Sequence, residues 1–365
     1  MERPLTHLAL LTALAAALTG CSTGTGARPA GDPATAPPPG VTATAPSPPL
    51  PVEGGVAALE NAYERVIGRV LPSIVQINTR TGLGSGVVYD ASGHIVTNAH
   101  VIGDATTFEV TLASGGAPRS ARLVESFELG DLAVIKVDDP SGLAPAKFGD
   151  SGRLRVGQIV LAMGNPLGLS GSVTNGIVSA LGRTVTEPQS EGSPGATITN
   201  AIQTSAAINP GNSGGALVDL SGEVIGIPTL AATNPELGGG AAPGIGFAIP
   251  SNTVTDIAGQ IIRGGKVTNT RRAALGVSVQ TVVGPGGGVV GVGVMRVTPG
   301  GGADKAGIRP GDVITSVNGT ETTTTQALSE ALAALKPGEQ AQVGLIRADG
   351  STATVTVTLG ELSED

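Results

Sequence analysis

Apolar and polar residues alternate in short runs through the middle of the chain, and glycine-rich segments separate the runs. The clearest runs are Ile74–Ile77, Gly86–Tyr89, His94–Thr97, Val134–Val137, Ile159–Ala162 and Val224–Ile227. Alternation is typical of a strand with one buried face, and Asp90–Gly93 and Asp219–Gly222 have the composition of hairpin turns. The pattern predicts an all-β barrel or sandwich pair from Ser73 to about Ile249.

Two helices are expected at the ends of this all-β segment. Val56–Leu71 carries apolar residues at helical spacing, and Pro72 ends it. A second helix follows the strands, and we expect Ser251 to cap it and Gly264-Gly265 to end it. Its inward face is expected to hold Val254, Ile257, Ala258 and Ile261.

The last part of the chain, Leu275 to Leu362, has a pattern of its own and predicts a small α+β module. The expected strands are Gly276–Val282, Val289–Val297, Val313–Val317, Val343–Arg347 and Ala353–Leu359. One helix, about Thr325 to Leu335, repeats leucine every three to four residues.

Composition narrows the classes of function. The chain has 365 residues, enough for two or three domains that each bury a core. A formal net charge of −8 without a basic cluster argues against nucleic acid as a partner, and 2% aromatic residues leave no platform for stacking bases. The sequence lacks the Cys/His or carboxylate clusters of metal sites and the glycine-rich loop and lysine of nucleotide sites, so we expect no metal or other cofactor.

The N-terminal residues predict export and attachment to a membrane. Leu8–Leu18 is an apolar run too short to stay as a spanning helix, which is typical of a signal peptide over residues 1–20. Leu18-Thr19-Gly20-Cys21 resembles the lipobox of bacterial lipoproteins, which implies lipidation of Cys21. An ordinary secretory signal with an incidental cysteine is the alternative. Residues 21–55, rich in proline, threonine and alanine, predict a disordered stalk.

Three residues in sequential order, His100, Asp131 and Ser213, are the candidate catalytic group. Ser213 lies in Gly211-Asn212-Ser213-Gly214-Gly215, where glycines allow a sharp turn whose N–H groups can face a developing oxyanion. A serine hydroxyl becomes a nucleophile when an imidazole takes its proton and a carboxylate orients the imidazole. A structural role is the alternative for His100 taken by itself. For His94, at the start of an expected strand, we expect a solvated or packing role. The three residues together predict a serine protease.

Beyond this group, the chain resembles the HtrA/Deg family of trypsin-like serine proteases over about residues 56 to 362. The matching motifs are Gly84–Val87, Thr97–Val101, Asp131–Lys136, Ala162–Gly168, Val173–Ser179, Ala207–Gly215 and Gly244–Pro250. The resemblance implies a mainly β fold, with a chymotrypsin-like double Greek-key β-barrel followed by a small α+β PDZ domain. The expected boundaries are 56–265 for the protease domain, 266–274 for a linker and 275–362 for the PDZ domain.

By this resemblance, Ser213 is the nucleophile, His100 the general base and acid, and Asp131 the carboxylate that orients His100. The N–H groups of Gly211 and Ser213 are expected to form the oxyanion hole. Losing one such donor typically costs about 2.7–4 kcal/mol of transition-state stabilisation. The loop before Ser213 is therefore expected to matter as much as the triad, and a switch between competent and collapsed states at Asn209-Pro210 is a hypothesis.

The expected substrate pocket is apolar. Ala207 lies six residues before the nucleophile, where trypsin-type enzymes place the acid that selects Arg and Lys, and the wall strand Pro228–Ala231 is also uncharged. Ala207, Ile208, Leu230 and Ala231 are therefore expected to favour a small aliphatic residue such as Val or Ala before the cleaved bond. Discrimination should be modest, because one methylene is worth only about 1–3 kcal/mol.

In the second module, Leu275-Gly276-Val277 resembles the carboxylate-binding loop of PDZ domains. Its N–H groups are expected to hold a peptide C-terminus while the next strand pairs with the peptide. Leu328, on the expected helix, either borders this groove or belongs simply to the core.

These inferences predict an ATP-independent serine endopeptidase of the bacterial cell envelope, anchored through lipidated Cys21, that cleaves unfolded or damaged proteins through an acyl-enzyme on Ser213. The alternatives are a regulatory protease with one dedicated substrate and a protease-inactive chaperone or peptide-binding sensor. The connection Thr79–Leu83 is too short for the long loop with which some family members build cages. The resemblance therefore implies a homotrimer.

Overall fold

The computed structural model describes residues 54–80, 82–165, 171–187, 195–209, 211–234, 240–284 and 288–362. The expected signal peptide, Cys21 and almost all of the expected stalk lie outside these residues. Within the described ranges, no helix has both the length and the apolar character needed to cross a membrane.

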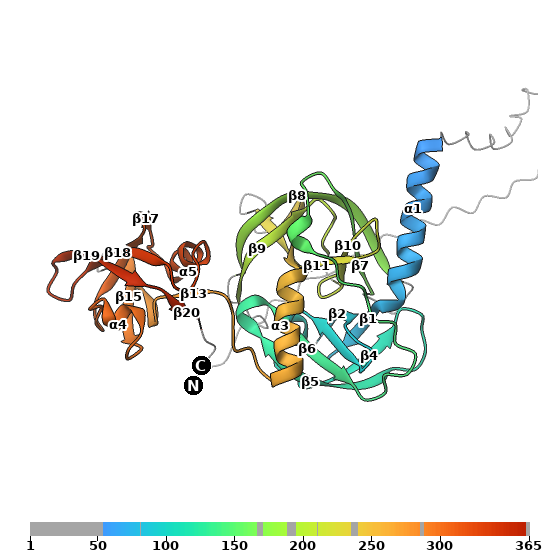
Figure 1. The fold of residues 1–365 in the computed structure, drawn as a ribbon, viewed down its shortest axis with the longest axis horizontal. Coiled ribbons are helices and arrows are strands. Elements are labelled where there is room, and N and C mark those ends of the chain that lie inside the picture. The colour runs from blue at the N-terminus through green and yellow to red at the C-terminus, as the bar shows by residue number, and fades with distance from the viewer. Residues whose placement is uncertain are drawn as a thin grey trace, which may run out of the picture. The chain divides into compact units, whose positions relative to one another are not determined.

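The first six strands close into an N-terminal barrel (Figure 1). They run in the order β1-β2-β3-β6-β5-β4, and β4 pairs back with β1. The hairpin expected at Asp90–Gly93 is confirmed, since the Asp90 carboxylate accepts the Ser92 N–H and its carbonyl accepts the Gly93 N–H. The strand bounds are β1 Ile74–Asn78, β2 Leu83–Val88, β3 His94–Thr97, β4 Thr107–Leu112, β5 Arg119–Phe127 and β6 Leu132–Val137.

The next six strands close a C-terminal barrel in the order β10-β11-β12-β9-β8-β7. The alternating pattern located β7 and β11 but missed the long β8–β9 pair. Three register shifts interrupt that pair, so its buried residues do not alternate regularly along the sequence. The bounds are β7 Ile159–Gly164, β8 Ser172–Glu187, β9 Ala196–Thr204, β10 Ala216–Asp219, β11 Val224–Asn234 and β12 Gly240–Pro250. The expected double barrel is confirmed.

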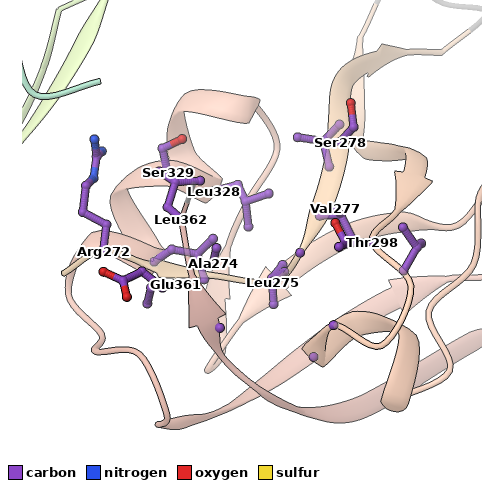
Figure 2. Close-up of a pocket in the computed structure, with 18 of the residues that line it drawn as sticks. Arg272, Ala274, Leu275, Val277, Ser278, Thr298, Leu328, Ser329, Glu361 and Leu362 are labelled. Atoms are coloured by element: carbon purple, nitrogen blue, oxygen red, sulfur yellow. The ribbon is translucent and has the colours of Figure 1, made fainter. Parts of the chain in front are cut away.

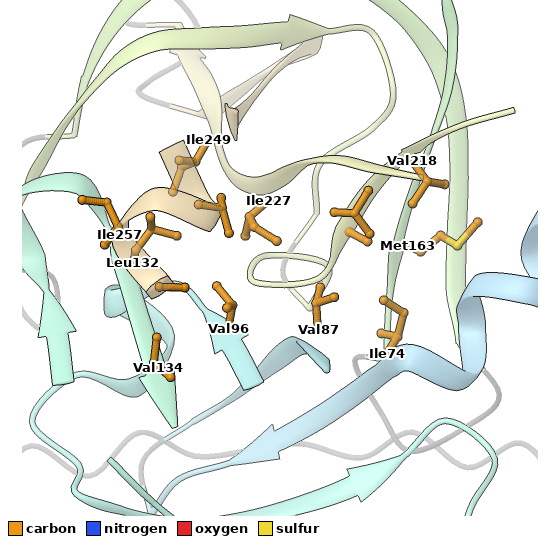
Figure 3. Close-up of a cluster of buried hydrophobic side chains, with 14 of the residues drawn as sticks. Ile74, Val87, Val96, Leu132, Val134, Met163, Val218, Ile227, Ile249 and Ile257 are labelled. Carbon is orange, nitrogen blue, oxygen red and sulfur yellow. The ribbon is translucent and has the colours of Figure 1, made fainter. Parts of the chain in front are cut away.

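The largest core cluster contains side chains from both barrels (Figure 3). Val87, Val96 and Leu132 come from the N-terminal barrel, and Met163 and Ile227 come from the C-terminal barrel. Each is at most 2% exposed, and burying one such side chain contributes roughly 1.5–3 kcal/mol. This shared core fixes the two barrels against each other, so residues on facing loops are held at defined distances.

Helices complete the protease part of the chain, and the N-cap expected for one of them is wrong. Helix α3, Ser251–Gly264, buries Val254, Ile257, Ala258 and Ile261 as expected, and Gly265 ends it in a left-handed conformation. Ser251 does not cap it: Pro250 is the N-cap, and the Ser251 hydroxyl donates to the carbonyl of Gly149. The other helical segments are α1 Gly54–Val70, η1 Leu71–Ser73, α2 Ala99–Ile102, η2 Glu128–Gly130 and η3 Ser151–Arg153.

The C-terminal module is a twisted sheet of order β14-β15-β16-β18-β19, with short β17 beside β16 and a separate β13–β20 pair. All five expected strands and the expected helix are present within a few residues. Thr324 caps α5 by accepting the Ala327 N–H. The bounds are β13 Ala273–Ala274, β14 Val277–Val283, β15 Val289–Val297, α4 Gly302–Lys305, β16 Val313–Val317, β17 Thr320–Glu321, α5 Thr325–Ala333, β18 Gln340–Ile346, β19 Thr352–Thr358 and β20 Gly360–Glu361.

Candidate active site

His100 and Asp131 lie together where β3 and β6 pair in the N-terminal barrel. His100 is on α2, directly after β3, and Asp131 precedes β6 in a left-handed conformation with φ of 53°. Nδ1 of His100 lies 2.9 Å from Oδ2 of Asp131, and the backbone N–H of His100 donates to Oδ1 over 3.0 Å. Asp131 is 2% exposed, so these bonds replace the water that a carboxylate otherwise needs. They also hold the imidazole in one orientation.

Thr229, on β11, completes the surroundings of the Asp131 carboxylate. Its hydroxyl donates to Oδ2 of Asp131, and both residues are buried. The sequence identifies Thr229 only as an uncharged residue of the expected pocket wall, Pro228–Ala231. No local pattern reveals a hydrogen bond between residues 98 positions apart.

Ser213 lies on the turn before β10, and its hydroxyl donates to the carbonyl of Thr229 over 3.1 Å. The residue after it has to be glycine. Gly214 has φ of 78°, and a Cβ built there would lie 2.3 Å from the Ser85 carbonyl oxygen and 2.4 Å from Thr97 Oγ1. Its N–H donates to the Pro228 carbonyl over 3.0 Å, which ties the serine turn to β11.

The loop before Ser213 is held by the side chain of Asn212, which is 3% exposed. Its Oδ1 accepts the Asn209 N–H and its Nδ2 donates to the Ala207 carbonyl, each over 3.0 Å. Gly211 has φ of 106°, a conformation that favours glycine. Pro210 lies outside the described residues, so the switch at Asn209-Pro210 stays a hypothesis.

A cleft of about 970 Å³ brings His100, Gly211 and Ser213 together. The residues from the N-terminal barrel that line it include Leu83, Gly84 and Ile102, and those from the C-terminal barrel include Ile208, Asn209, Thr229 and Ala231. Both barrels therefore contribute walls to one opening that contains every residue of the candidate group except the buried Asp131.

Two of the four expected substrate-pocket residues do not line this cleft. Ile208 and Ala231 do, but Leu230 packs against the hydrophobic core. Thr229 and Ala231 both line the cleft, and Leu230 between them does not. The side chain of Ala207 is also absent from the lining, and its carbonyl accepts hydrogen bonds from Thr174 and Asn212.

Of the solvated and packing roles expected for His94, the structure shows the packing one, since the residue is buried. Its Nδ1 lies 2.7 Å from Oδ2 of Asp90 within the β2–β3 hairpin. In the part of the chain that the structure describes, no group of three or more His, Cys, Asp or Glu side chains is placed to hold a metal ion.

A second cavity, of about 680 Å³, lies in the C-terminal module (Figure 2). Leu275, Gly276 and Val277 line it, and Leu328 faces them from α5. Leu328 is 4% exposed, so it is both a core residue and a wall of the groove. β14 is the last strand in the sheet order, which leaves an edge on which an extended peptide can pair.

Comparisons with known proteins agree with this geometry. The family model of the trypsin-like peptidase domain matches residues 84–227, and the model of the PDZ domain matches residues 273–359. Periplasmic serine endoprotease DegP of Escherichia coli K12 is 42% identical over 287 residues, which are 78% of this chain and 58% of that protein. The chain thus spans less than two thirds of the length of that relative.

Two further relatives match over more of their own length. Serine protease PepD of Mycobacterium tuberculosis is 38% identical over 319 residues, which are 83% of this chain and 67% of that protein. The crystal structure of the serine endoprotease from Yersinia pestis is 36% identical, with a TM-score of 0.54, and the match covers 82% of this chain and 98% of that one. With its trypsin-like double barrel and its PDZ domain, the chain belongs to the HtrA/DegP-type family of serine proteases.

Proposed function

We propose that the protein is a serine endopeptidase in which Ser213 attacks the peptide bond, His100 transfers the proton and Asp131 orients His100. The observation that carries the proposal is the His100–Asp131 pair, with an Nδ1 to Oδ2 distance of 2.9 Å, in a cleft that also exposes Ser213. Nδ1 donates to the carboxylate, so Nε2 is the ring nitrogen left to accept a proton.

The geometry supports the following sequence of steps. Ser213 donates to the Thr229 carbonyl in the structure, so its single hydroxyl proton has to turn to His100 when substrate binds. His100 takes this proton as the Ser213 oxygen attacks the carbonyl carbon, and the N–H groups of Gly211 and Ser213 stabilise the oxyanion. His100 passes the proton to the leaving amine as the peptide bond breaks, which releases the first product and leaves an acyl-enzyme. Water then gives a proton to His100 as its oxygen attacks the ester, and His100 returns that proton to the Ser213 oxygen as the ester bond breaks, which releases the second product.

Casein digestion by the wild type and by Ser213→Ala tests the proposal. We expect wild-type cleavage and loss of cleavage in the variant, together with labelling of the wild type alone by a fluorophosphonate. Equal digestion by both proteins would overturn the protease function, and absence of digestion and of labelling in both would favour the chaperone or sensor alternative.

We infer a preference for small aliphatic residues before the cleaved bond. Ile208 and Ala231 are apolar and Thr229 is uncharged, and all three line the cleft with Ser213. A peptide library that varies this residue tests the inference: Val and Ala should be cleaved faster than Lys or Arg, and the reverse order would refute it.

For the PDZ domain we propose binding of peptide C-termini at Leu275–Val277. Gly276 has φ of 78°, which turns the backbone at the mouth of the groove. A hydrophobic peptide with a free carboxylate should bind, and the same peptide with an amidated C-terminus should bind more weakly. Equal affinity would exclude recognition of the carboxylate.

We propose an extracytoplasmic location with attachment through lipidated Cys21, unfolded or damaged envelope proteins as substrates, and a homotrimer. The relatives DegP and DegQ of Escherichia coli are named periplasmic, which supports the location. Cys21→Ser should release the protein from the membrane fraction, and unchanged fractionation would refute anchoring through Cys21. Sedimentation of the purified protein tests the trimer.

A further inference from the structure

Ser85 is a buried serine to which the steps above assign no role. It lies on β2 in the N-terminal barrel, and none of its surface is exposed. Its hydroxyl donates to the Gly211 carbonyl over 2.6 Å and accepts the Asn165 N–H over 2.7 Å. Its own N–H donates to the Ser213 carbonyl over 3.1 Å, and its own carbonyl accepts from Thr97 Oγ1 over 2.7 Å. Every polar group of Ser85 therefore has a partner.

The direction of the Ser85 hydroxyl proton follows from these contacts. The Asn165 N–H can only donate, so it occupies a lone pair of the Ser85 oxygen. The single hydroxyl proton must then point to the Gly211 carbonyl. The N-terminal barrel thereby holds a carbonyl of the loop that precedes the candidate nucleophile in the C-terminal barrel.

The two carbonyls that Ser85 binds belong to Gly211 and Ser213, the residues whose N–H groups are expected to form the oxyanion hole. The N–H and the carbonyl of Gly211 lie in successive peptide units that meet at its Cα. A displacement of the loop that carried the Gly211 Cα and N–H away from the cleft would also move the carbonyl. That movement would break a hydrogen bond in a site closed to solvent and leave a buried acceptor unpaired, which is unfavourable. The Ser85 contact therefore opposes such a displacement.

The end of β7 also leaves this loop little room. A Cβ built on Gly164, at the end of β7, would lie 2.5 Å from the Asn212 Cα and 2.7 Å from the Gly211 oxygen. The β7 backbone thus supports the loop by contact, while Ser85 supplies the directional hydrogen bonds that set the orientation of its carbonyls.

We propose that Ser85 is a positioning residue of the proteolytic reaction: its hydroxyl and N–H bind the carbonyls of Gly211 and Ser213 and so hold these two residues in place at the cleft, where their N–H groups are expected to bind the oxyanion. This role rests on the proposed protease function and deepens it. Ser85 acts before the reaction by limiting the conformations of the loop, without touching the substrate.

Ser85→Ala in the full chain tests the role with a fluorogenic peptide substrate and a peptide aldehyde of matching sequence. The aldehyde forms a hemiacetal with Ser213 whose oxygen occupies the same hole as the transition state. We expect kcat to fall about 10- to 100-fold with KM changed by less than about twofold, because the hole acts mainly on the transition state. The affinity for the aldehyde should fall by about the same factor as kcat/KM.

Ser251→Ala is the matched control. The Ser251 hydroxyl is equally buried and donates to the Gly149 carbonyl over 2.7 Å, but it lies at the start of α3 and does not line the cleft. The control loses the same kind of hydrogen bond, so its melting temperature should fall and its kcat should stay at the wild-type value. A Ser85→Ala protein that keeps wild-type kcat and aldehyde affinity, or that changes only KM, overturns the positioning role.

Amide hydrogen exchange tests whether Ser85 holds the loop without any measurement of turnover. Faster exchange over residues 205–214 in Ser85→Ala, and not in Ser251→Ala, supports the role, whereas unchanged exchange overturns it. Ser213→Ala tests the proposed function separately: if its cleavage equals that of the wild type, the protease function fails, and the exchange measurement still decides whether Ser85 holds the loop.

Discussion

The hydroxyl of Thr229 donates a hydrogen bond to the carboxylate of Asp131, which lies 98 positions earlier in the chain and in the other barrel. The same carboxylate accepts from the backbone N–H and the ring Nδ1 of His100. The Thr229 carbonyl in turn accepts the Ser213 hydroxyl. One residue of β11 therefore contacts two members of the candidate triad, so the two barrels have to dock before the site is complete.

Thr229→Val keeps the shape of the side chain and removes the donor to Asp131. We expect kcat to fall roughly tenfold and the free energy of unfolding to fall by about 1–3 kcal/mol, because a buried acceptor loses a partner. Peptide kinetics and urea unfolding measure the two effects. Thr255→Val on α3, which removes a solvent-exposed hydrogen bond to the Asn252 carbonyl, is the control and should change neither. A Thr229→Val protein with wild-type kcat would show that the bond does not help to position Asp131.

Asp131→Asn should abolish most activity and leave the fold intact. Asparagine tolerates the left-handed conformation of residue 131, so the backbone has no reason to move. The amide, however, favours the wrong tautomer of His100, which in a related triad lowers kcat by about 10⁴-fold. Circular dichroism tests whether the fold stays intact, and kcat measures the loss of activity. A fall in kcat of less than about tenfold would argue against the orienting role of Asp131.

Gly214→Ala should destabilise the protease domain far more than Gly115→Ala. Both glycines have positive φ, but a Cβ on Gly214 would lie 2.3 Å from the Ser85 carbonyl oxygen, whereas one on Gly115 would have nothing within 4 Å. Backbone strain alone costs about 1 kcal/mol, so the steric conflict should add at least about 2 kcal/mol more at Gly214. Urea unfolding of both variants measures the difference, and equal losses would contradict the predicted conflict.

Asp90→Asn should alter the pH dependence of stability. Partial burial raises the pKa of Asp90, but hydrogen bonds from His94 and Ser92 outweigh it and hold the pKa below its ordinary value. The folded protein then binds this proton less tightly than the unfolded chain does. Asp90 therefore stabilises the fold above the unfolded pKa of about 3.9, and the contribution is lost as the pH falls through the lower folded pKa.

Urea unfolding of the wild type and Asp90→Asn at about pH 6 and about pH 3 measures this contribution. The difference at the higher pH should stay below about 1 kcal/mol, since water screens a pair this exposed, and it should shrink at the lower pH. A difference that is the same at both values would show that the Asp90 carboxylate does not stabilise the fold through its charge.

Leu328→Ala should weaken peptide binding to the PDZ domain, and Leu345→Ala should not. Both leucines belong to the core of the module, but only Leu328 lines the groove. Each substitution should cost about 2–5 kcal/mol of stability. Titration with a hydrophobic C-terminal peptide, at a temperature where both variants are folded, separates the roles. Equal loss of affinity would show that Leu328 acts only through the core.

Much of the fold follows from local patterns. β3, β15 and β16 have the predicted bounds, because short apolar runs between turn residues are typical of strands with buried positions. The alternating pattern did not predict the long β8–β9 pair, because register shifts interrupt the regular alternation of buried and exposed residues along it. Ser251 was wrongly expected to cap α3. Serine favours N-cap positions, but in the folded protein its hydroxyl donates to the Gly149 carbonyl.

The sequence by itself determined the kinds of group that the site contains and their order: an imidazole, a carboxylate and a serine in a glycine turn. These signals are local, because a residue type and its neighbours set turn geometry and chemical reactivity. Only the tertiary structure decided which groups support them. The Thr229 hydroxyl donates to Asp131, the Ser85 hydroxyl donates to the Gly211 carbonyl, and Ala231 rather than Leu230 lines the cleft. Such contacts join residues distant in the chain, and they exist only after the shared core has brought the two barrels together.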